Sequence, residues 1–64
     1  MDIVRAIELA IEDEKQAQQK YHAAAEAAQD QETKLLLQQM AKEEEQHERR
    51  LVERLKALKL LRNL

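Results

Sequence analysis

The sequence contains no cysteine, no proline and no glycine, and Tyr21 is its one aromatic residue. Without cysteine it can form neither a disulfide nor a thiolate-bound metal or iron–sulfur site. Without proline and glycine it lacks the two residues that most strongly disfavour helix. Most of the chain is Ala, Leu, Glu, Lys, Gln and Arg, which are strong helix formers. The composition therefore predicts an all-α protein.

The chain also lacks an excess of one charge and any long apolar run. Its 13 acidic and 11 basic residues give a net charge of -2, which disfavours a nucleic-acid-binding face or a polybasic membrane anchor. No apolar stretch approaches the roughly 18 residues of a membrane span. Residues 1–5 show neither the basic nor the apolar region of a secretory signal. We therefore expect no nucleic-acid partner, no membrane partner and a cytoplasmic location.

With 64 residues the chain forms one domain and has few residues with which to build a core. Domains of this size usually depend on disulfides, a metal or a partner chain, and the missing cysteines leave only the last two. The narrow residue alphabet is also typical of engineered or consensus sequences, which is a side hypothesis about origin.

Apolar and small residues recur every three or four positions, which is the periodicity of a helix with one inward face. The spacing predicts helices over about residues 2–28 and 31–62, with a turn at about 29–31. Asp30 is a favourable N-cap for the second helix, and Glu32 suits its first turn. Two long helices with a short connection must lie antiparallel, so the chain is a helical hairpin. The residues that carry the pattern are Ile3, Ile7, Ala10, Ala17, Tyr21, Ala24, Ala28, Leu37, Met40, Leu51, Leu55 and Leu58.

Three polar residues interrupt this inward pattern. Glu14 occupies the gap in the first helix, and Glu44 and His47 occupy the gap in the second. Counted from a turn at position 30, Glu14 lies 16 residues before it, and Glu44 and His47 lie 14 and 17 after it. All three are therefore expected at one level of the hairpin. Charged groups on an inward face are costly unless they are paired or bind a metal.

A homodimer would turn these three residues into a complete metal site. Two copies supply four carboxylates and two neutral imidazoles, whose charge of -4 balances two divalent cations. A Glu from each of two helices and a Glu-x-x-His from each of the other two form the di-metal sites of four-helix bundles. This ligand set suits Fe(II) or Mn(II), and Zn(II) is also compatible. We therefore predict an antiparallel four-helix bundle with two ions per dimer and with its turns at opposite ends.

The sequence around these residues resembles the rubrerythrin branch of the ferritin-like superfamily. Residues 14–21, EKQAQQKY, are similar to its first helix, in which a ligand Glu precedes a Tyr by seven positions. Residues 40–47, MAKEEEQH, are similar to its second helix, and the turn at 29–32, QDQE, resembles its Asp-Pro-Glu with Gln in place of Pro. The resemblance covers about residues 6–58, and designed di-iron hairpins share the ligand spacing.

The resemblance implies a di-iron protein with ferroxidase chemistry, or with O2- or hydrogen-peroxide-reducing chemistry. It also implies that the Tyr21 hydroxyl hydrogen-bonds a ligand carboxylate, with a core aromatic residue as the alternative. Two departures stand out, because the family usually carries both hairpins in one chain and adds a Cys-rich rubredoxin domain that supplies electrons.

Other interpretations remain beside this one. Glu14, Glu44 and His47 could form a metal-free polar layer, and the dimer could be a structural or minimal-model bundle that metals only stabilise. A small RNA-binding dimer is the interpretation that the balanced charge favours least. Among the neighbouring side chains, we expect His22 to be exposed and Met40 to fill the core. We expect Glu48 to be solvated, with an extra carboxylate near the site as the alternative.

Overall fold

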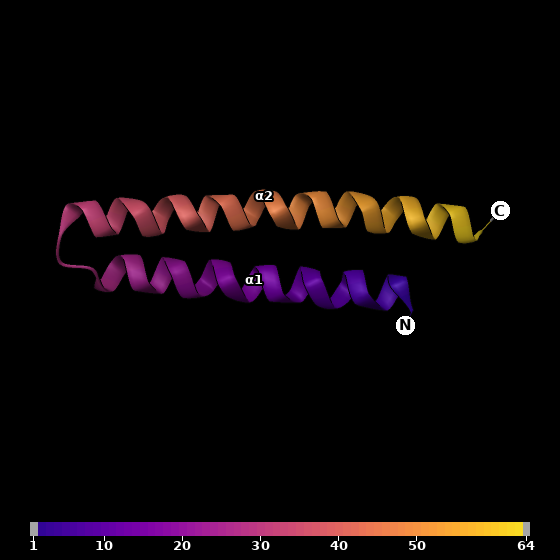
Figure 1. Ribbon diagram of the computed structural model, residues 1–64, viewed down its shortest axis with the longest axis horizontal. Helices are drawn as coiled ribbons and strands as arrows, with labels where there is room; N and C mark the ends of the chain where they lie inside the picture. The colour runs from indigo at the N-terminus through magenta and orange to yellow at the C-terminus, as the bar shows by residue number, and fades with distance from the viewer. Residues whose placement is uncertain (1, 64) are drawn as a thin grey trace.

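A computed structural model describes residues 2–63 as two helices, α1 (Ile3–Ala27) and α2 (Gln31–Arg62). They lie antiparallel along their lengths and are joined by a short connection (Figure 1). The hairpin measures 52 × 17 × 13 Å, and its radius of gyration is 15.0 Å. A compact chain of this length would have a radius of about 11 Å. The single chain is therefore a rod with a large surface for its volume.

Aspartate caps begin both helices. The Asp2 carboxylate accepts a hydrogen bond from the Val4 amide at 3.0 Å, and the Asp30 carboxylate accepts one from the Thr33 amide at 2.8 Å. The bonds from Thr33 hold the pKa of Asp30 below its usual value. These caps satisfy amides that have no partner inside the helix. Helix α1 begins one residue later and ends one residue earlier than the sequence pattern predicts.

The end of α1 explains how the chain turns without glycine. Ala28 leaves the helix in an extended conformation, with φ -68° and ψ 134°. Its amide still bonds to the carbonyl of Ala24 at 3.0 Å. The turn therefore needs no left-handed residue, and residues 2–63 contain no positive φ angle.

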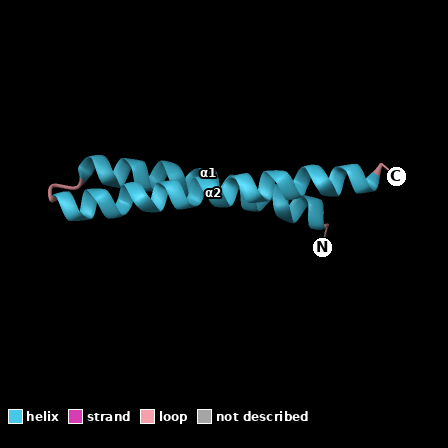
Figure 2. Cartoon of the chain, turned by 90° about the horizontal axis from the view of Figure 1, so that it is seen from above, coloured by secondary structure: helices cyan, strands magenta, loops and turns pink. Residues whose placement is uncertain are grey.

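The core of the single hairpin is thin. The buried hydrophobic residues among those described are Val4, Ile11, Ala25 and Ala41. Only the first two are large, and both lie in the half of α1 nearest the N-terminus. Helix α2 is the longer element, and its end extends past the start of α1 (Figure 2). Neither described helix is long and apolar enough to cross a membrane.

Candidate metal centre

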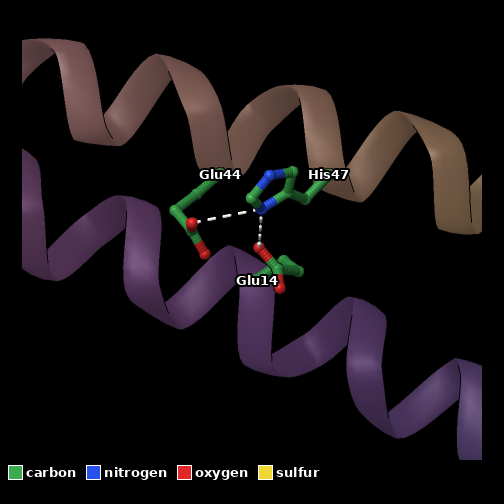
Figure 3. A group of neighbouring side chains, drawn as sticks. All are labelled: Glu14, Glu44 and His47. Atoms are coloured by element: carbon green, nitrogen blue, oxygen red, sulfur yellow. Dashed lines mark ion pairs between the residues drawn. The ribbon is translucent and has the colours of Figure 1, made fainter.

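Glu14, Glu44 and His47 converge between the two helices near the middle of the hairpin (Figure 3). The spacing of Glu44 and His47 places them on one face of α2, because positions i and i+3 are neighbours on a helix. The His47 Nδ1 atom lies 3.2 Å from Glu44 Oε1 and 3.5 Å from Glu14 Oε2. One ligand atom from each side chain fits within 4.8 Å of the others. The structure thus brings together the three residues that the sequence places at one level.

The three side chains differ in burial. Those of Glu14 and Glu44 are each 22% exposed, whereas that of His47 is 48% exposed. The Oε2 atom of Glu14 is buried and has no hydrogen-bond partner within residues 2–63. Its contact with His47 Nδ1 at 3.5 Å is an ion-pair distance without a hydrogen bond. A buried oxygen without a hydrogen bond is unfavourable, and an ion among these groups would supply the missing partner.

The carboxyl groups of Glu14 and Glu44 lie close enough to alter protonation when no metal is bound. The Glu44 carboxyl raises the pKa of Glu14, chiefly because a hydrogen bond between the two carboxyls requires a proton. Partial burial raises the pKa of Glu14 further, and the opposing effect of His47 is smaller. A cation can take the place of this proton, so metal binding and proton release are coupled.

The donor set fits a divalent cation of intermediate hardness. Carboxylate oxygens with one imidazole suit Fe(II) and Mn(II) and also accommodate Zn(II). Within residues 2–63 the cluster has three such residues, and His47, which contacts both carboxylates, is the most exposed of them. The cluster could therefore hold one divalent cation with coordination positions left over.

Glu48 is half-buried and hydrogen-bonded beside the cluster, so it is not the freely solvated side chain that we expect and fits the alternative of a carboxylate near the site. Its Oε1 atom accepts a hydrogen bond of 2.6 Å from Gln18 Nε2, and the pair is partly buried. The same amide nitrogen donates to the main-chain oxygen of Glu14 at 3.3 Å. Gln18 is not among the residues predicted from the sequence. Its spacing of seven residues from Ile11 was the available signal, since seven residues are two helical turns.

The remaining predicted residues lie outside the cluster. Tyr21 is half-buried, and its ring stands 5.0 Å from Lys20 Nζ, but within residues 2–63 no hydrogen bond joins its hydroxyl to the three ligand candidates. Its role beside a ligand therefore stays a prediction. His22 is exposed, as expected, and lines a shallow hollow of about 460 Å³ with residues of α2. Met40 is half-buried.

Comparison with known proteins agrees with this geometry. The sequence model of the Rubrerythrin family matches residues 5–64, a range that includes all three ligand candidates and Tyr21. Searches of curated proteins and of solved structures gave no match.

Proposed function

The chain belongs to the rubrerythrin family, and we propose that two copies form a four-helix bundle that binds two iron ions and reduces O2 or hydrogen peroxide. The observation that carries this proposal is the half-site of Glu14, Glu44 and His47. A second copy related by a twofold axis would complete it with the same three residues. The turns of the two hairpins would then lie at opposite ends of the bundle.

Two of the exposed large apolar residues, Ile3 and Leu36, support a partner on the face that bears the half-site. At about 100° per residue, Ile3 lies within about 20° of Glu14 around α1, and Leu36 within about 20° of His47 around α2. Ile3 is 58% exposed and Leu36 is 57% exposed. Leu35, by contrast, lies about 120° from His47. An apolar surface on the same face as the open site is what a second hairpin would cover.

The surface area of the hairpin also favours a partner. The single chain exposes 5198 Å², whereas a compact protein of its mass, 7.5 kDa, exposes about 4,200 Å². The surplus of roughly 1,000 Å² is comparable to the roughly 800 Å² that each partner buries in a typical stable interface.

The carboxylates and imidazoles of the completed site would have different roles in metal binding. Four carboxylates would neutralise two divalent ions, and the two His47 imidazoles would each give one nitrogen ligand. Glu14 would give up the proton that its raised pKa favours in the metal-free chain. When bound as a ferrous pair, the metal would supply one electron per ion to the oxidant.

Oxidation of bound Fe(II) tests this function. The chain is loaded anaerobically with one Fe(II) per chain, exposed to air, and followed by ferric absorption in the near ultraviolet. We expect oxidation well above the rate of free Fe(II) in the same buffer. Glu44→Ala should abolish this excess rate, and Glu45→Ala should keep it. Glu45 is a suitable control because it is exposed and pairs with Arg49 at 2.9 Å.

The alternative is a bundle in which the metals are only structural. Stoichiometric binding of Fe(II) without any acceleration of its oxidation would support that alternative and refute the oxidoreductase proposal.

A further inference from the structure

One hydrogen bond links the two helices directly beside the cluster of Glu14, Glu44 and His47. It runs from Gln18 Nε2 to Glu48 Oε1 at 2.6 Å, and both side chains are partly buried. The same nitrogen touches the main-chain oxygen of Glu14 at 3.3 Å, so the amide lies level with that residue. Glu48 follows His47 directly in the sequence. The bond therefore connects the backbone of one ligand candidate to the neighbour of another.

The bond lies behind the cluster, in the seam where the helices meet. Gln18 is two turns from the buried Ile11, and Glu48 is two turns from the buried Ala41. Residues seven apart differ by only about 20° around a helix, so both partners lie along the buried side of their helices. Glu14 is rotated by about 60° from Ile11, toward the face that carries the cluster.

The site needs a fixed register between the helices, because Glu14 comes from α1 and the other two ligand candidates come from α2. Buried large apolar side chains could set this register, but among the described residues these are Val4 and Ile11, both on one side of the site. On the side toward the turn, the buried residues are Ala25 and Ala41, and the larger Tyr21, Leu37 and Met40 are only half-buried. Alanines interlock weakly, since they project little from the helix surface.

We propose that Gln18 is a positioning residue that, through Glu48, holds Glu14 level with Glu44 and His47. The inference rests on the proposed metal site. It adds Gln18, a residue that is not itself a ligand candidate. A hydrogen bond to a carboxylate is strong and directional, and this one is short. It therefore fixes the axial position of α1 against α2 where the ligand geometry requires it.

The pairing can be reversed without changing the net charge. In the double variant Gln18→Glu with Glu48→Gln, the amide at position 48 donates to the carboxylate at position 18. Gln18→Glu alone instead places two carboxylates against each other. Gln18→Leu removes the donor and leaves the Glu48 carboxylate unpaired.

Co(II) titration, followed by its visible absorption, measures affinity and ligand geometry together. Changes in groups that orient metal ligands typically weaken binding 10- to 100-fold. We expect a loss of about tenfold or more for Gln18→Leu and for Gln18→Glu, with an altered cobalt spectrum. The reversed double variant should recover affinity to within about threefold of the wild type, together with its spectrum, because it restores the hydrogen bond.

A second link between the helices provides the matched control. Arg62 Nη2 bonds to Asp2 Oδ1 at 2.8 Å, far from the cluster, with both side chains more than half exposed. Arg62→Ala should leave Co(II) affinity and spectrum unchanged. Thermal unfolding of each metal-free variant separates general destabilisation from misplacement of the ligands.

The outcomes distinguish this inference from the proposed function. Wild-type Co(II) affinity and spectrum in Gln18→Leu would overturn the positioning role alone. The role would also be overturned if the reversed double variant, folded as judged by its helicity, bound no better than Gln18→Glu. A wild-type chain that binds no Co(II) would overturn the metal site on which the inference rests.

Discussion

Leu36 and Leu35 offer a direct test of the proposed dimer and of the face on which its second hairpin would pack. They are adjacent on α2 and almost equally exposed, at 57% and 54%. Leu36 nevertheless shares the face of His47, whereas Leu35 points about 120° away from it. Leu36→Glu should therefore disrupt the dimer, and Leu35→Glu should not.

The size of the effect follows from the area that the partner would cover. Complete burial of a leucine side chain contributes about 1.5–3 kcal/mol, and somewhat more than half of the Leu36 residue remains exposed in the single hairpin. The twofold axis of the proposed dimer would apply each substitution twice, so the lost burial alone would amount to about 2 kcal/mol per dimer. This corresponds to a dissociation constant raised about 30-fold. Desolvation of two carboxylates would increase the loss.

The assay is sedimentation equilibrium of the metal-free chain, with circular dichroism to confirm that the variants remain helical. Both leucines are exposed in the single hairpin and glutamate is a good helix former, so the hairpin itself should change little in stability. Equal dissociation constants for the two variants would refute the reasoning. A larger loss in Leu35→Glu would place the partner on the opposite face.

Three further predictions concern stability. The raised pKa of Glu14 gives the metal-free chain stability that is present below its ordinary pKa of 4.5 and is lost as pH rises through the raised value. Glu14→Gln should remove this loss in urea unfolding measured across pH 4–8, and an unchanged pH profile would contradict the assigned pKa shift. The lowered pKa of Asp30 acts in the opposite direction, because its stabilisation is lost as pH falls below 3.8. Asp30→Asn, which keeps a capping oxygen, should weaken that acid sensitivity, as melting curves between pH 2 and 5 can show. Ala41 is 1% exposed, so Ala41→Leu should destabilise the hairpin by about 1–3 kcal/mol in urea unfolding, and a neutral effect would mean that the seam is loosely packed.

The periodicity of the sequence is enough to predict the hairpin and the cluster. Helix formers without glycine or proline leave few alternatives to two helices, and Asp30 marks the start of the second. The level of Glu14, Glu44 and His47 follows from counting residues outward from the turn. Such counting works because each residue advances an α-helix by a constant 1.5 Å.

Counting residues could not predict the pairing of Gln18 with Glu48. The bond depends on how far two long side chains reach across the seam and on the rotamers that they adopt there. Glu48 directly follows His47 in a chain rich in glutamate, and sequence spacing does not separate it from the solvated glutamates. The orphaned oxygen of Glu14 is likewise visible only in three dimensions.

Native mass spectrometry of the chain, after anaerobic loading with Fe(II) and removal of excess metal, tests the central claim most directly. It reads the number of chains and the number of ions in the same particle. The shared site predicts two chains with two ions, and loss of both ions in Glu44→Ala. A single chain with one ion, or a dimer with none, would contradict it.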